Sequence, residues 1–118
     1  MHNNDPHISI RDVSLDAIVY VNGRPDRSAT LPPNSRYVEI IEKLLVKKKG
    51  SWKRSFVSYA PSVYVRKDDF SINMTKTFIV VNYKDQYNRF VQVIASVNVD
   101  EYNDILESIT YYFNKEKK

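Results

Sequence analysis

The period of apolar and polar positions changes several times along this chain. Residues 70–75 alternate most clearly, because Phe70, Ile72 and Met74 point to one side of an extended chain and polar residues point to the other. Similar alternation, or a short apolar run, occurs in other segments that turn residues delimit. These segments predict strands over residues 16–21, 24–31, 51–60, 62–66, 70–75, 77–83 and 89–99.

Two segments show the helical period of about 3.6 residues instead. The first begins at a capping residue, Asn34 or Ser35, and is expected to end near Lys48 with Gly50 as its terminator. The second follows Asp100, which we predict to be its N-cap. The apolar stripes are Tyr37, Val38, Ile41, Leu44 and Leu45 in the first helix, and Tyr102, Ile105, Leu106, Ile109, Tyr112 and Phe113 in the second.

These elements define a fold class. Consecutive strands that are joined by short loops pair in an antiparallel sheet. We therefore predict an α+β fold, in which an antiparallel sheet of about five to six strands carries two helices on one face. The 118 residues suit one domain, which we place at 8–113 between a flexible tail at 1–7 and a charged tail at 114–118.

Composition excludes several classes of protein. The chain has no cysteine, so disulfide scaffolds and thiolate metal sites are excluded, and its two glycines are too few for a phosphate-binding glycine loop. The first residues, "MHNNDPHIS", lack the apolar segment of a signal peptide, and no apolar run has the length of a membrane span. We expect a cytoplasmic protein that binds no membrane.

Candidate residues for catalysis or metal binding are few. The two histidines, His2 and His7, lie in the predicted tail, where no packing would fix them as ligands. Asp68–Asp69 falls at a predicted turn, and Glu39 and Glu42 lie on a lysine-rich helix. None of these carboxylates has the apolar surroundings that make an effective acid or base at neutral pH. We therefore predict no metal, no cofactor and no enzymatic activity.

Charge is segregated along the chain, although the net charge is only +4. Residues 36–54 carry seven basic and two acidic side chains, whereas residues 100–107 carry four acidic and no basic ones. Complementary charge is a common way for proteins to associate quickly. We expect the acidic helix to present Glu101, Asp104 and Glu107 to a basic protein partner.

The hairpin loop at 84–88 is a second candidate for the partner surface. It is flanked or occupied by Tyr83, Tyr87 and Arg89, and tyrosine and arginine are favoured at protein interfaces. In the alternative interpretation, the loop is an ordinary turn and its tyrosines lie back on the sheet.

The stretch "LLVKKKGSWKRSF" offers a different function, that of a nucleic-acid-binding module. Cations beside an exposed ring can hold a single strand by stacking and by phosphate contacts. The residues concerned are Lys47, Lys48, Lys49, Trp52, Lys53 and Arg54. We favour a structural interpretation, in which the lysines complement the negative end of a helix dipole and the rings of Trp52 and Phe56, on one strand face with Arg54, are buried.

By elimination, the sequence predicts a non-enzymatic protein-binding domain. One role with this profile is that of a small cytosolic inhibitor of the bacterial immunity-protein type, which neutralises a cognate toxin by binding it. The nucleic-acid-binding module is the first alternative. A homo-oligomeric structural subunit, which pairs an exposed sheet edge with a second copy, is the other.

Overall fold

A computed structural model describes residues 4–116 of the chain, which form seven strands and two helices. The predicted tails at 1–7 and 114–118 lie partly outside these residues, and His2 lies outside them. In chain order the elements are β1 (Leu15–Val21), β2 (Arg24–Leu31), α1 (Arg36–Lys47), β3 (Lys53–Arg54), β4 (Val63–Lys67), β5 (Phe70–Met74), β6 (Phe78–Lys84), β7 (Phe90–Ser96) and α2 (Val99–Glu116).

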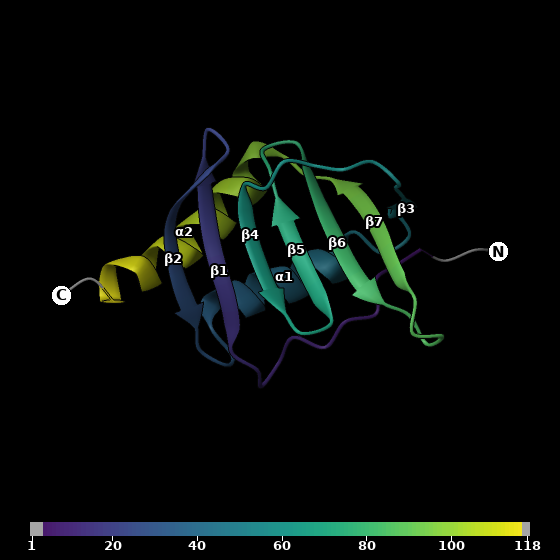
Figure 1. Cartoon of the computed structure of the whole chain (residues 1–118), viewed down its shortest axis with the longest axis horizontal. Helices are drawn as coiled ribbons and strands as arrows, with labels where there is room; N and C mark the ends of the chain where they lie inside the picture. Colours follow the sequence, from purple (N-terminus) through teal and green to yellow (C-terminus); the bar gives the residue numbers. More distant parts are fainter. Residues whose placement is uncertain (1–3, 117–118) are drawn as a thin grey trace.

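All of these strands join one antiparallel sheet, and both helices lie behind it in the view of Figure 1. The strand order is β2-β1-β4-β5-β6-β7-β3. The predicted α+β class, with an antiparallel sheet and two helices, is therefore confirmed. The sheet has seven strands rather than five to six, because both the β1–β2 hairpin and the two-residue strand β3 join it at its edges.

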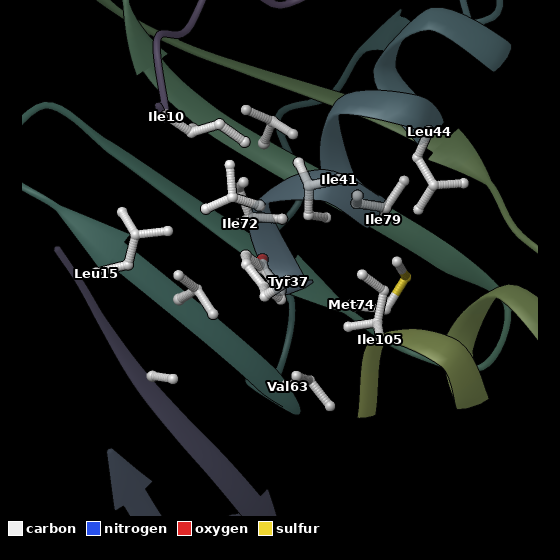
Figure 2. Packing of buried hydrophobic residues seen from close by; sticks show 14 of the residues in the cluster. Ile10, Leu15, Tyr37, Ile41, Leu44, Val63, Ile72, Met74, Ile79 and Ile105 are labelled. Carbon is white, nitrogen blue, oxygen red and sulfur yellow. The ribbon is translucent and has the colours of Figure 1, made fainter. Parts of the chain in front are cut away.

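The core lies between the helices and the sheet face that they cover. Leu15, Ile72 and Ile79 reach it from the strands, whereas Tyr37 and Ile105 reach it from α1 and α2 (Figure 2). All five side chains are fully buried. Burying one aliphatic side chain of this size contributes about 1.5–3 kcal/mol, so this layer fixes the helices on one face and leaves the other face to different residues.

Local signals explain several element boundaries. Asn22 and Gly23 have φ angles of 52° and 78°, and a two-residue hairpin turn needs positive φ at both central residues. α1 begins after Ser35, whose hydroxyl accepts a hydrogen bond from the Val38 N–H at 3.4 Å. The chain leaves α1 through Gly50, which has a φ angle of 82°. The predicted turn, cap and terminator are confirmed.

The predicted N-cap of α2 is wrong, because the cap is Asn98 and not Asp100. The side-chain oxygen of Asn98 accepts a hydrogen bond from the Glu101 N–H at 2.8 Å, and the Glu101 carboxylate accepts one from the Asn98 N–H at 2.9 Å. This reciprocal pair is a capping box, which satisfies two N–H groups at once. α2 therefore begins at Val99.

The predicted strand over residues 51–60 is also wrong, because only Lys53–Arg54 pairs with β7. The following residues, 55–62, form a loop that we call the strap. The strap leads from β3, at one edge of the sheet, to β4 in its interior, and it passes the end of the sheet at which β6 begins (Figure 1).

Side chains hold the strap in place of a strand ladder. The buried Asn73 accepts a hydrogen bond from the Ser62 N–H at 2.8 Å and donates one to the Ala60 carbonyl at 3.1 Å. Gln92 donates to the Val57 carbonyl at 2.7 Å. These bonds satisfy backbone groups that strand pairing would otherwise have to satisfy.

Candidate protein-binding surface

The sheet face that carries no helix, here called the open face, is covered only at one end. There the ring of Tyr59 in the strap lies 4.9 Å from the ring of Phe78, and Val80 of β6 is buried. The other end of the open face receives neither helix nor strap. Any partner that binds to the sheet would meet this uncovered end.

The uncovered end forms a shallow groove with a polar floor. The register of the strands places Asp16 opposite Arg66, Arg66 opposite Ser71, and Ser71 opposite Asn82. The groove has a volume of about 390 Å³, and Phe90 forms part of its wall. Within residues 4–116, none of the four polar side chains forms a hydrogen bond or ion pair, so all four are available to a partner.

Large apolar side chains are exposed along the β7 edge of the sheet, where Phe90 also lines this groove. Phe56, Val57, Tyr87 and Phe90 are 91%, 61%, 67% and 70% exposed, and we call these four residues the β7 rim. Val57 is next to β7 because Gln92 binds its carbonyl, Phe90 is two residues from Gln92 on the same face, and Tyr87 lies in the turn before Phe90. Clustered exposed rings, unlike single ones, mark interaction sites.

Cations lie over two rings of the β7 rim. The Lys84 ammonium is 5.3 Å from the centroid of the Phe90 ring, and the Arg89 guanidinium carbon is 5.0 Å from that of Tyr87. Such pairs contribute about 0.5–1 kcal/mol at exposed sites. The β7 rim therefore presents apolar surface and positive charge together, the combination that is enriched at interface centres.

The turn between β6 and β7 is fixed by one carboxylate. Asp85 accepts hydrogen bonds from the N–H groups of Tyr87 and Arg89 at 2.9 and 3.0 Å, and from the Arg89 Nε at 3.3 Å. The backbone bond from Arg89 is the main reason that the pKa of Asp85 lies below its usual range. The turn therefore holds Tyr87 and Arg89 in defined positions. The bond to Tyr87 uses only its backbone N–H, so its ring stays exposed.

A second hollow, here called the hairpin pocket, lies between this turn and the N-terminal segment. Its volume is about 560 Å³, and its lining includes the cationic side chains of Arg54 and Lys84, the rings of Tyr83 and Tyr87, and the Asp85 carboxylate. Burial raises the pKa of the Tyr83 hydroxyl, and the positive charge of Arg54 opposes that shift. The pocket therefore combines cationic groups with a tyrosine ring of the β7 rim.

Of the residues predicted to bind a partner, Glu101 has a structural role. It is buried, and its carboxylate accepts hydrogen bonds from Lys47 at 2.8 Å and from Lys48 at 3.1 Å. Burial alone raises the pKa of Glu101, but the bonds from Lys47, the Asn98 N–H and Lys48 outweigh it and lower the pKa to about 2. Glu101 thus joins α1 to α2 instead of facing solvent.

The other predicted residues are divided between surface and core. Asp104 and Glu107 are exposed on the outer side of α2. Tyr83 is only 7% exposed, because it points toward the core from β6, whereas Tyr87 and Arg89 are exposed at the turn. The structure brings Tyr83, Tyr87 and Arg89 together and places them apart from the α2 carboxylates, which belong to the opposite layer.

The basic stretch does not form one surface. Lys47 and Lys48 bind Glu101, and the Trp52 ring, which a stacking platform would expose, is 4% exposed. Lys49, Lys53 and Arg54 remain exposed. The structural interpretation is therefore right about the Trp52 ring and wrong about the Phe56 ring, which is 91% exposed because the strand does not continue to it. The charge of Lys47 and Lys48 is explained by a partner on α2, which the dipole argument did not include.

The described residues show how the remaining titratable candidates lie. Within residues 4–116 no three His, Asp or Glu side chains are placed to hold a metal ion. Asp68–Asp69 forms the predicted turn between β4 and β5, and Glu42 binds Arg11 at 2.8 Å. Across the same part of the chain, no helix combines the length and the apolar character needed to span a membrane.

Sequence reasoning missed Val57 and Phe90 of the β7 rim, and it considered Phe56 only as a core ring or as part of the nucleic-acid stretch. The predicted strands gave each of them a sheet position, where alternation would bury half of the side chains. One signal was present in the sequence: Phe56-Val57 is an apolar pair inside a polar segment, and a strand with one buried face does not explain both.

Comparisons of the chain with protein-family models, with curated proteins and with solved structures found no match. The functional inference below therefore rests on the surfaces described above.

Proposed function

We propose that the protein is a non-enzymatic, cytoplasmic binding domain that captures another protein through the β7 rim and the adjoining groove of the open face. The observation that carries the proposal is that four exposed apolar side chains lie along the β7 edge of the sheet, two of them under cations. Rings and cations of this kind supply most of the binding free energy at protein interfaces.

The mixture of charges on this side favours a protein over a nucleic acid as the partner. Arg66 and Lys67 line the groove together with Asp16 and Asp68. A phosphate backbone is uniformly negative and would be repelled by those carboxylates, whereas a protein can place an opposite charge against each group. The buried Trp52 also removes one ring from a stacking platform.

As a biological role we propose an inhibitor of the bacterial immunity-protein type, which neutralises a cognate toxin by binding it. The support is the profile of the chain: one small fold with a preformed recognition surface, and surface charge that has no partner within the described residues. Asp104 and Glu107, on the outer side of α2, are the second surface that such a toxin could contact.

The test is an affinity purification of the tagged protein from its native cell extract, with and without nuclease and at two salt concentrations. We expect a stoichiometric protein partner that survives nuclease, and its loss on Phe56→Ala/Phe90→Ala. Val46→Ala is the matched control, because Val46 is equally exposed but lies on α1.

The toxin role needs its own measurement. If the recovered partner is toxic when expressed alone, co-expression of this protein should restore growth, and the Phe56→Ala/Phe90→Ala variant should not. Recovery of RNA that disappears with nuclease would contradict protein binding. If the partner is lost instead on Asp104→Lys/Glu107→Lys, the binding surface is on α2 and not at the β7 rim.

A further inference from the structure

We propose that the hairpin pocket receives an acidic side chain of the protein partner and that Arg54 binds its carboxylate. This inference rests on the proposed protein-binding function and identifies the chemistry of the partner: a glutamate or aspartate next to a large apolar residue. The apolar residue would contact the β7 rim while the carboxylate enters the pocket.

The position of Arg54 is fixed although its side chain is exposed. β3 holds the Arg54 backbone opposite Val93 of β7, and the continuing bond from the Ser55 N–H to the Gln92 carbonyl, at 3.0 Å, steadies the next residue. The side chain lines the hairpin pocket. Within residues 4–116, the Arg54 guanidinium has no hydrogen-bond or ion-pair partner, so its donors are available.

One carboxylate, Asp85, lines the pocket, and Asp5 lies in the neighbouring N-terminal segment; both already accept hydrogen bonds from donors of this chain. Asp85 accepts three hydrogen bonds inside its own turn. Asp5, in the N-terminal segment, accepts one from the Gly50 N–H at 2.8 Å. Lys84 has only a loose contact with Asp69, at 3.7 Å. An incoming carboxylate therefore meets an unpaired guanidinium, and a charge-assisted hydrogen bond to it is about twice as strong as a neutral one.

The pocket is continuous with the β7 rim, because Tyr87 belongs to both. That continuity defines the occupant as a segment with an acidic and an apolar side chain side by side. A symmetric pairing of two copies through this surface fits poorly, since it would bring the same cations, Lys84, Arg89 and Arg54, against one another. Arginine suits this role because its planar fork matches a carboxylate with two donors.

The test is a titration of the isotope-labelled full chain, followed by the chemical shifts of its backbone amides. The probe is the N-acetylated, C-amidated peptide Gly-Glu-Phe-Glu-Gly, and its lysine analogue is the charge control. For an isolated segment we expect a Kd of about 1 mM, with the largest shifts at residues 53–54 and 83–91 and none from the lysine analogue.

Two variants locate the carboxylate. Arg54→Glu should weaken binding of the glutamate peptide at least about tenfold, the effect of losing one charge-assisted hydrogen bond, and should make the lysine analogue the better ligand. Arg24→Glu makes the same charge change at the opposite edge of the sheet and should alter the Kd less than about twofold.

Several outcomes would overturn the inference. They are an absence of shifts at millimolar peptide, shifts centred on the α1 lysines, and equal effects of Arg54→Glu and Arg24→Glu. If the same amides shift without peptide as the protein concentration rises, the occupant of the pocket is a second copy of this chain and not a different protein. None of these results depends on the β7 rim variants, so a partner that still requires Phe56 and Phe90 would leave the proposed function standing.

Discussion

Replacing Glu101 by glutamine tests whether the charged groups of the two helices hold the fold together. The substitution keeps the size of the side chain and the oxygen that accepts the Asn98 N–H, but it removes the negative charge. Lys47, at 2.8 Å, then loses its acceptor oxygen. Lys48, at 3.1 Å, keeps the oxygen that it shares with the Asn98 N–H but loses the negative charge, although Lys48 is itself largely buried. A cation left unpaired near the core makes the substitution costly.

The magnitude follows from the protonation of Glu101. Its pKa is about 2 in the fold against an ordinary 4.5, and a difference of that size corresponds to at most about 3 kcal/mol. The Lys47 side chain is 63% exposed, so water screens part of its contribution. We expect Glu101→Gln to lower the free energy of unfolding by about 2 kcal/mol at pH 7.

The same argument fixes the pH dependence. Because the folded state holds the Glu101 proton more weakly than the unfolded state does, the stabilisation is complete above about pH 4.5 and disappears as the pH falls toward 2. Urea unfolding of the wild type and of Glu101→Gln, followed by circular dichroism, should show a difference at pH 7 that shrinks over this range. Glu107→Gln, an exposed change on the same helix, should cost less than about 0.5 kcal/mol. Equal losses in the two variants, or a difference that does not depend on pH, would refute the reasoning.

Three further predictions concern single side chains. Tyr37→Phe should leave the free energy of unfolding unchanged or raise it by about 1 kcal/mol, because the buried hydroxyl has no partner among the described residues; a marked loss in urea unfolding would mean that it does. Asn73→Ala should cost about 1–3 kcal/mol and speed hydrogen exchange at the Ser62 N–H, which unchanged exchange would contradict. Phe56→Ala should shift the free energy of unfolding by less than about 0.5 kcal/mol, since the ring is exposed, and Phe90→Ala by no more than about 1 kcal/mol, the contribution of its pair with Lys84; a larger thermal or urea effect would assign the ring to packing and not to binding.

The elements of the fold were predictable where one period dominated and a local signal closed the segment. Ser35, Gly50 and the Asn22–Gly23 turn act through their immediate neighbours, so the chain itself contains the reason for each boundary. The N-cap of α2 was also encoded, since Asn98 and Glu101 have capping-box spacing, but Asp100 is an equally good cap by residue type. Residue preference alone could not choose between them.

The binding surface was less predictable, because its contacts join distant segments. Glu101 and Lys47 are far apart in sequence and meet only when α2 packs on α1. The basic stretch and the acidic helix, which looked like separate surfaces in the sequence, are therefore paired in part with each other. The strap has the alternation of a strand, yet Asn73 and Gln92 bind its backbone from other strands. Because these hydrogen bonds from other strands replace strand pairing, Phe56 and Val57 are exposed.

The way each charge is held also indicates where a partner gains most from binding. Glu101 already accepts bonds from two lysines and closes the capping box, so a partner could use it only by breaking internal hydrogen bonds, each worth about 1.5–3 kcal/mol when charged. Arg54 gives up no such bond within the described residues, and the exposed ring of Tyr87, which lines the same pocket, loses only its contact with water. The net gain is therefore larger at the β7 edge than at the helix layer, although the helix layer contains the more conspicuous run of charge in the sequence.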